Sequence, residues 1–184
     1  GSTVTLLKNI EMTDTLDINK NIILDFDGNE FKNSTDNVGI IIRNSITLKN
    51  GTITKEGSNY GIRIYGNGNV NFENMKIVGY TPGQENVNYT ILLSGYNGKL
   101  VLRNTNVTAN KCAVVSIGNT AKPTVVIESG ELLAKKDRAI YLGAGTLIIG
   151  KDDGNVSKDS PSIVSEDDNI YFENNGNYVH FEMY

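Results

Sequence analysis

Several residue types are scarce in this chain of 184 residues, and each scarcity excludes a class of structure or site. There is no Trp, and there are three Pro, one Cys and one His. A single cysteine, Cys112, excludes an internal disulfide and a metal cage built from several thiolates. It precedes Ala113 and Val114, which favours a packed small side chain over a reactive thiol. The single histidine, His180, has no Ser or Cys motif around it, so nothing supports a Ser–His or Cys–His nucleophile.

Positive charge and long apolar runs are also lacking. The net charge is -4 and no basic cluster occurs, so we expect no nucleic-acid partner. No apolar run is long enough to span a membrane, so we expect no membrane insertion, and we recognise no signal peptide. We interpret Gly1-Ser2 as the scar of a cleaved tag. Residues 3–184 then form a single domain, which we expect to be a segment of a longer protein.

The abundant residues are those of strands and tight turns. The chain is rich in Val, Ile, Thr and Asn and contains 19 Gly. Apolar residues alternate with polar ones in short runs, for example Val4-Leu6, Leu16-Ile18 and Ile22-Leu24-Phe26. No run keeps the apolar period of about 3.6 residues that a helix requires. We therefore predict an all-β chain with no significant helix.

A repeat organises the chain from Gly39 onward. Gly39–Ile53 and Gly61–Ile77 are its clearest copies, and weaker copies begin at Thr90, Ala113, Ala139 and Asn169. Two positions in each copy are apolar and, at the strand period of two, face inward together. The first holds Ile40, Ile62, Ile91, Val114, Ile140 and Ile170, and the second holds Ile42, Ile64, Leu93, Ser116, Leu142 and Phe172. Because Ser116 is polar, we consider a one-residue slip that would turn Ile117 inward instead.

Asparagine marks the turn after the second strand of three copies, at Asn50, Asn74 and Asn104. Asn tolerates the left-handed backbone of a sharp turn, and stacked amides can bond along an axis, so we predict a structural ladder. Repeats of 22 to 30 residues made only of strands predict a right-handed parallel β-helix of about seven to eight coils. The alternative is a two-sheet sandwich, which requires antiparallel pairing and leaves the recurring asparagine unexplained.

Two stretches resemble a known family. Val4–Lys8, continued by Leu16, Ile18, Lys20, Ile22, Leu24-Asp25 and Gly28, resembles the opening coils of right-handed parallel β-helix domains of the pectate-lyase-like superfamily. Leu147–Ile163 is similar to a recurring coil of such domains. They occur in exported and cell-surface proteins of Gram-positive bacteria, so the resemblance implies an extracellular setting. It implies no single activity.

Polysaccharide lyases of that superfamily bind calcium through carboxylate clusters. Asp25 and Asp27 flank the inward Phe26 and are expected to point outward together, but the next coils carry no such pair of carboxylates there. They carry Lys49, Glu73, Arg103 and Glu128, which indicates a charge-compensated outer ladder. The densest acidic stretch contains Asp152 and Asp153 and does not match an EF-hand. We interpret it as a solvated turn, with a weak calcium site as the alternative, and expect no cofactor.

The outward positions between and beyond the two inward columns are less polar than a solvated sheet requires. They hold Ile41, Arg63, Leu92, Val115, Tyr141 and Tyr171, and then Arg43, Tyr65, Ser94, Ile117, Gly143 and Glu173. From these we select Arg43, Arg63, Tyr65, Tyr141 and Tyr171 as a candidate ligand-binding outer face, suited to a glycan or a protein partner. The alternative is that residues 79–88 or other loops cover this face, or that it reflects only stacking along the sheet.

These features predict a non-enzymatic module of a bacterial exported or cell-surface protein, a stalk or adhesin that binds a glycan or a surface protein. The alternative is a divergent polysaccharide-active enzyme, lyase-like or hydrolase-like. We prefer the non-enzymatic module because an enzyme of either kind needs clustered acid and base residues, and no such cluster stands out in the sequence.

Overall fold

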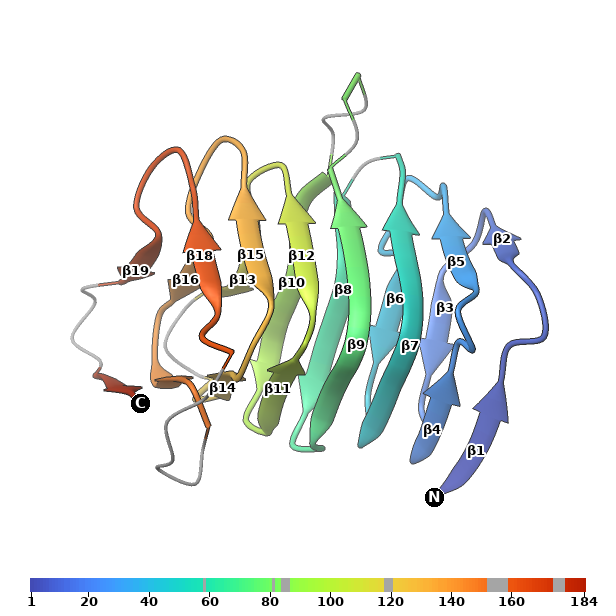
Figure 1. The fold of residues 1–184 in the computed structure, drawn as a ribbon, viewed down its shortest axis with the longest axis horizontal. Helices are drawn as coiled ribbons and strands as arrows, with labels where there is room; N and C mark the ends of the chain where they lie inside the picture. Colours follow the sequence, from blue (N-terminus) through green and yellow to red (C-terminus); the bar gives the residue numbers. More distant parts are fainter. Residues whose placement is uncertain (58, 81, 84–86, 118–120, 152–158, 174–177) are drawn as a thin grey trace.

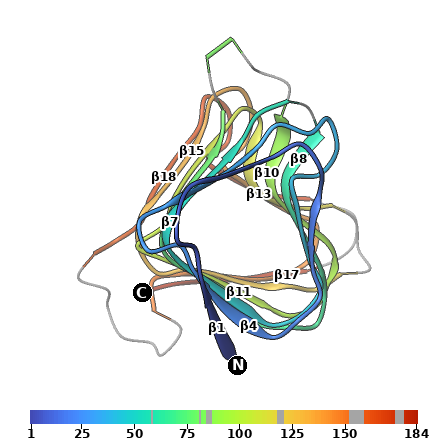
Figure 2. The ribbon, with the colours of Figure 1, turned by 90° about the vertical axis from the view of Figure 1, so that its right-hand side faces the viewer.

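The described part of the chain folds into strands joined by turns. The computed structural model describes residues 1–57, 59–80, 82–83, 87–117, 121–151, 159–173 and 178–184, and contains no helix within them. The strands lie on three faces, seen edge-on in Figure 2. The first face contains β1 (Ser2–Thr5), β4 (Ile22–Asp25), β7 (Ile46–Lys55), β9 (Val70–Gly79), β11 (Lys99–Arg103), β14 (Thr124–Ile127), β17 (Gly145–Ile149) and β20 (Val179–Met183).

The other two faces follow the first in every coil. The second face contains β2 (Ile10–Met12), β5 (Glu30–Asn33), the C-terminal halves of β7 and β9, β12 (Asn106–Ala109), β15 (Glu131–Ala134) and β18 (Ser162–Val164). The third face contains β3 (Leu16–Ile18), β6 (Ile40–Ile42), β8 (Asn59–Gly66), β10 (Val87–Tyr96), β13 (Cys112–Ser116), β16 (Ile140–Leu142) and β19 (Ile170–Phe172).

Neighbouring strands on each face come from successive coils and pair in parallel, as on the third face from β3 to β19. In Figure 2 the N-terminus is nearest the viewer and the chain winds clockwise as it recedes, which is a right-handed sense. Figure 1 shows the coils stacked side by side along the long axis, with the two termini at opposite ends. The predicted all-β parallel β-helix is confirmed, and the antiparallel sandwich is excluded.

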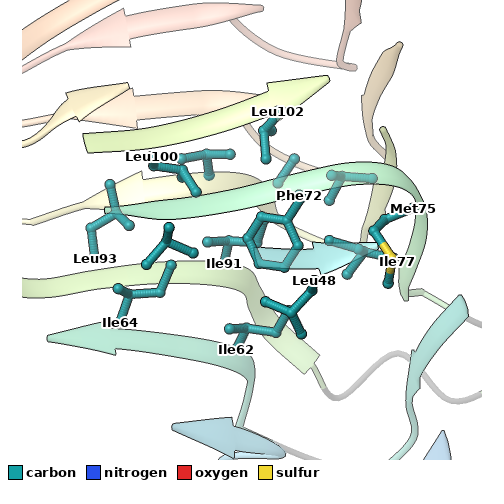
Figure 3. Close-up of a cluster of buried hydrophobic side chains, with 14 of the residues drawn as sticks. Leu48, Ile62, Ile64, Phe72, Met75, Ile77, Ile91, Leu93, Leu100 and Leu102 are labelled. Atoms are coloured by element: carbon teal, nitrogen blue, oxygen red, sulfur yellow. The ribbon is translucent and has the colours of Figure 1, made fainter. Parts of the chain in front are cut away.

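The hydrophobic core lies inside the three faces, because alternate residues of each strand point inward and every inward position recurs in the next coil. On the first face Leu48, Phe72 and Leu102 are in register, and on the third Ile64 and Leu93 are. Figure 3 shows these side chains filling the space between the two faces. All five are at most 1% exposed, and burial of each stabilises the fold by roughly 1.5–3 kcal/mol.

The corner between the first and second faces carries the asparagine ladder. Asn50, Asn74 and Asn104 have left-handed backbones, with φ of 60°, 53° and 45°. Nδ2 of Asn74 donates to Oδ1 of Asn50 at 3.1 Å, and Nδ2 of Asn104 donates to Oδ1 of Asn74 at 2.9 Å. Asn50 in turn donates to Oδ1 of Asp25, and the backbone N–H of Asn104 donates to Oγ of Ser129. The three amides therefore form one hydrogen-bonded row along the axis.

Ser116 stays in the inward column, so the one-residue slip considered above is wrong. Ser116 pairs with Leu142 and is fully buried, whereas Ile117 points outward and is 53% exposed. A slip would turn Val114, which pairs with Ile140, out of the core, and that loss outweighs burying one hydroxyl. Within the described ranges, Oγ of Ser116 has no hydrogen-bond partner.

Two predictions concern residues outside the described ranges. Asp152 and Asp153, the alternative calcium site, both lie outside them. Of the loop at 79–88, residues 81 and 84–86 also lie outside them, so whether it covers the outer face stays a prediction. The described part of the chain contains no helix long and apolar enough to cross a membrane.

Candidate functional site

The outer side of the third face brings the candidate residues onto one sheet. Parallel pairing places Arg63 on β8, Tyr141 on β16 and Tyr171 on β19 in a single row along the axis. Tyr65 lies one outward position further along β8, and Arg43 lies at the matching position, directly after the end of β6. All five share this sheet, but they do not form one continuous surface, because Leu92 and Val115 separate the two groups.

The N-terminal group consists of Arg43, Arg63 and Tyr65. The two guanidinium carbons lie 5.2 Å and 4.7 Å from the centre of the Tyr65 ring, so both cations contact the same aromatic group. Nε of Arg43 also donates to both carboxylate oxygens of Asp17 at 3.0 Å, and this hydrogen bonding raises the pKa of Arg43. Nη2 of Arg63 donates to Oγ of Ser94 at 3.0 Å. These side chains are largely engaged with one another.

The middle of the face is an apolar floor. Leu92 and Val115 point outward, yet they are only 7% and 1% exposed and pack with Cys112. Tyr60 and Tyr89 pack against this cluster, and their rings stack with centres 5.7 Å apart and an interplanar angle of 4°. A ligand that reaches this region therefore meets aromatic and aliphatic surface.

The C-terminal group adds a cation that sequence analysis did not select. Tyr141 and Tyr171 have ring centres 5.2 Å apart, and the guanidinium of Arg138 lies 4.2 Å from the centre of the Tyr171 ring. Arg138 is also paired with carboxylates: its nitrogens are 3.2 Å from Asp137, 3.6 Å from Asp167 and 3.8 Å from Asp168. The charge of Arg138 is thus compensated by acidic neighbours.

A pocket of about 120 Å³ opens where the floor meets the C-terminal group, lined by Tyr89, Cys112, Val115, Ile117, Asp137, Arg138 and Tyr141. Burial raises the pKa of the Tyr89 and Tyr141 phenols, so both stay protonated and can donate hydrogen bonds at neutral pH. Burial also raises the pKa of Cys112 to about 12, so its thiol is not a nucleophile at neutral pH. The pocket combines aromatic walls, polar groups and an aliphatic base.

The outer face includes a third set of outward residues that the sequence analysis did not choose as candidates. They occupy one equivalent position in their copies and are Tyr60, Tyr89, Cys112 and Arg138. Each stands immediately before the first residue of an aligned copy, ahead of Gly61, Thr90, Ala113 and Ala139 respectively. At that corner the first residue of a copy, such as Ala113, faces the core together with the next residue, Val114, so the preceding side chain, here that of Cys112, points out. Reading this third outward position would have found the stacked tyrosines and the pocket arginine.

On the first face the predicted charged row is engaged in ion pairs. Nζ of Lys49 is 3.1 Å from Asp25, and Arg103 contacts Glu73 at 3.0 Å and Glu128 at 2.6 Å. The Asp25 carboxylate also accepts hydrogen bonds from the backbone N–H of Asp27 and from Asn50. These bonds, that from Asp27 first, lower the pKa of Asp25. The carboxylate of Asp25 is therefore already satisfied by protein donors.

The described ranges contain no group of three or more His, Cys, Asp or Glu side chains placed to hold a metal ion. Comparison with family models, with curated proteins and with solved structures gave no significant match. The site that we propose below is therefore argued from the geometry of the third face.

Proposed function

We propose that this protein is a non-enzymatic carbohydrate-binding module, and that it binds a neutral glycan on the outer side of its third face. The observation that carries the proposal is the pocket of about 120 Å³ between Tyr89 and Tyr141. Sugar rings present apolar C–H faces and a rim of hydroxyls, and flat aromatic faces beside hydrogen-bonding side chains suit both. The neighbouring row of aromatic side chains would extend the contact along the helix axis.

The electrostatics of the pocket favour a neutral ligand over an acidic one. Asp137, Asp167 and Asp168 surround Arg138, and the chain has a net charge of -4. An acidic sugar would be repelled by these three carboxylates, and Arg138 already forms ion pairs with them. Hydroxyl groups can instead donate to Asp137 and accept from Arg138 or from the tyrosine phenols.

Binding is a better proposal than catalysis because the pocket offers one carboxylate. Asp137 is the only acidic side chain among the described residues that line it, and it lies 3.2 Å from Arg138. Glycoside hydrolysis in its usual form needs two carboxylates on opposite sides of the bond. A place in an exported or cell-surface bacterial protein, and descent from the pectate-lyase-like superfamily, are part of this proposal and rest on the sequence resemblance.

The test is a screen of neutral and acidic oligosaccharides, followed by titration calorimetry with variants. Ile117 is half-exposed at the rim of the pocket, so Ile117→Lys should obstruct the pocket without disturbing the core. Ile117→Lys and Tyr141→Ala should each weaken binding at least tenfold, or about 1.4 kcal/mol. Tyr178→Ala is the matched control, because Tyr178 is 93% exposed and does not line the pocket.

Three outcomes would overturn the proposal. Binding that survives both pocket variants would place the glycan elsewhere. A screen without any glycan, together with capture of a protein through the same residues, would make the face a protein-binding surface. Cleavage of the bound glycan, detected as new reducing ends or new ultraviolet absorbance, would make the protein an enzyme.

A further inference from the structure

One row of outward side chains on the third face is interrupted by a small residue. The row consists of the residues that stand before the aligned copies, and we call it the corner row: Tyr60, Tyr89, Cys112 and Arg138. Parallel pairing places Tyr60 beside Tyr89 and Tyr89 beside Cys112, and Arg138 follows in the next coil. All except Cys112 are large side chains that end in a flat group, so the row has a gap above Cys112.

The two tyrosines of the corner row show how its flat groups are oriented. Their ring centres are 5.7 Å apart and the rings are almost parallel, at 4°. The ring of Tyr60 therefore covers one face of the Tyr89 ring. The other face of Tyr89 is turned toward the next coil, where Cys112 is too short to cover it, and Tyr89 lines the pocket described above.

The same coil also has a small residue in the neighbouring outward row. There Val115 pairs with Tyr141 of the next coil. The pocket of about 120 Å³ lies above this coil, and we call it the slot. Its base is formed by Cys112 and Val115. Tyr89 forms one wall, and Arg138 and Tyr141 form the opposite wall.

The width of the slot follows from the spacing of the coils. Tyr89 and Arg138 belong to coils two steps apart, and each step is about 4.8 Å, so their backbones are roughly 10 Å apart. Atoms of stacked groups are about 3.5–4.0 Å apart at contact. One flat ring between the two walls therefore needs about 7–8 Å, and two rings would need about 11 Å or more. The slot has room for one ring only.

The slot is open at its outer edge. Cys112 and Val115 close its inner edge. Along the strand direction Asp137 stands at one end, just before Arg138, and Ile117 stands at the other, two residues after Val115. A ring that enters edge-on keeps its outer edge free for one linkage. A ring within an unbranched chain is linked at two places, so a terminal or branch residue fits the slot better.

The walls suit a sugar ring better than a purely apolar ring. Tyr89 offers an aromatic face to the C–H groups of a sugar. Asp137 and Arg138, whose charged atoms are 3.2 Å apart, offer an acceptor and donors to hydroxyl groups at the edge of the ring. An apolar ring in the same place would remove water from these charges without replacing its hydrogen bonds.

We propose that the slot takes up one sugar ring edge-on, between Tyr89 and Arg138, and that the protein thereby recognises a terminal or branch residue of a glycan. This inference rests on the proposed function, and it adds the number and the orientation of the residues held in the pocket. The rest of the glycan lies outside the slot, where the aromatic side chains of the outer face can contact it.

The test uses saturation-transfer NMR with single-residue probes. These are the methyl glycosides of glucose, galactose, mannose and N-acetylglucosamine, and that of the end residue of each oligosaccharide that binds in the screen. At least one probe should bind, and its protons on both faces of the ring should receive saturation, because a wall of the slot lies against each face. A sugar that lies flat on an aromatic platform receives saturation mainly on one face. N-acetyltyrosinamide, the comparison probe for an aromatic side chain, should bind more weakly.

Variants that fill or widen the slot give the matched comparison. Cys112→Tyr places a ring in the gap beside Tyr89 and should weaken methyl glycoside binding about tenfold or more. Tyr89→Ala removes one wall and should weaken binding to a similar extent. Thr47→Tyr is the control, because it adds the same ring to an outward position of the first face and should bind like the unaltered protein. Circular dichroism and the melting temperature establish that each variant is folded before it is scored.

Each contrary result is decisive. If oligosaccharides bind and no methyl glycoside does, the slot does not take up a single ring, and the proposed function still stands. Saturation on one face only would mean that the ring lies flat. Unchanged binding in folded Cys112→Tyr would place the ring outside the slot. Stronger binding of N-acetyltyrosinamide than of any glycoside would make the slot a site for an aromatic side chain of a protein. If neither oligosaccharides nor glycosides bind, the proposed function fails as well.

Discussion

The central coils and the terminal coils are built from the same repeat, yet equivalent inward side chains are buried to different extents in them. On the third face Ile62 and Ile91 are fully buried, whereas Leu16 and Ile170, at the two ends of the same column, are only half-buried. The side chains are alike, so the difference comes from neighbours: a central coil is covered by two coils and a terminal coil by one. Burial in this fold is a property of position along the axis.

The same contrast applies to the backbone. Strand β9 pairs with β7 on one side and with β11 and β12 on the other, while β20 pairs only with β17. In a solenoid, stability is close to a sum of repeat and nearest-neighbour terms, so the end coils should open first. The predictions below test how steeply stability falls from the centre to the ends.

The largest effect should come from removing an aromatic ring at the centre. Phe72 is fully buried, so Phe72→Ala should destabilise the protein by about 3–5 kcal/mol, the sum of lost burial and a residual cavity. Phe181 lies on the last strand, β20, and is 42% exposed, so Phe181→Ala should cost about 1 kcal/mol or less. Urea unfolding at a protein concentration where the chain is monomeric measures both. Equal losses would contradict the gradient.

The sequence predicted the fold because the fold has a one-dimensional rule. Once Ile40, Ile62 and Ile91 are read as one column, the parallel register follows, and the structure has that register. Ser116 was the doubtful member, and it stayed inward because the apolar residues around it fix the register of the whole strand. The direction of the Ser116 side chain is set by the apolar residues beside it in the strand, so the polarity of Ser116 alone does not predict it.

The sequence predicted which residues share the outer side of the third face, but not which of their side chains contact one another. The period of the repeat placed Arg63, Tyr141 and Tyr171 on one sheet. It did not reveal that Arg138 contacts Tyr171, or that Asp17 engages Arg43. Such pairs depend on side-chain conformations and on residues at the corners, where a simple alternation of inward and outward positions breaks down.

A buried lysine near the N-terminal end gives the next largest effect. Lys55 is 3% exposed at the corner between the second and third faces, where later coils carry Gly79, Ala109 and Ala134. Its Nζ donates to the carbonyl oxygens of Thr35 and Glu56. Burial lowers the pKa of Lys55 to about 8, although Asp36 and Glu56 oppose the shift.

The sign of the pH dependence follows from this shift. Between pH 8 and 10.5 the folded chain has released the Lys55 proton while the unfolded chain still holds it, so stability rises with pH across that window. We expect this group to contribute a rise of roughly 1–3 kcal/mol, and Lys55→Met should lack it. Urea unfolding of both proteins at several pH values isolates the difference. Parallel curves for the two proteins would mean that Lys55 titrates normally.

A smaller effect should come from the asparagine ladder. Asn74 bonds both Asn50 and Asn104, so Asn74→Ala loses two amide hydrogen bonds and strains a backbone with φ of 53°, at about 1–2 kcal/mol. Asn74→Gly keeps the backbone free and should lose less. Asn104→Ala loses one amide–amide bond and should also lose less. Equal losses for Ala and Gly at position 74 would assign the effect to the side-chain bonds alone, and no loss in either would mean that the ladder does not stabilise the fold.

The smallest effect on stability should come from removing an exposed charged side chain. It can be compared between a central coil, at Arg103, and the last coil, at His180. Arg103 bridges Glu73 and Glu128 across three central coils, while His180 contacts Glu182 within the last strand. The Arg103 side chain is 51% exposed, so Arg103→Met should cost only about 0.5–1 kcal/mol, and the loss should shrink in about 1 M salt. His180→Ala should leave the melting temperature unchanged, because the last strand opens before the centre unfolds. Amide hydrogen exchange should show faster exchange in the His180→Ala variant only within β20. A global destabilisation by His180→Ala larger than that of Arg103→Met would mean that the C-terminal coil, not the centre, limits the stability of the whole β-helix.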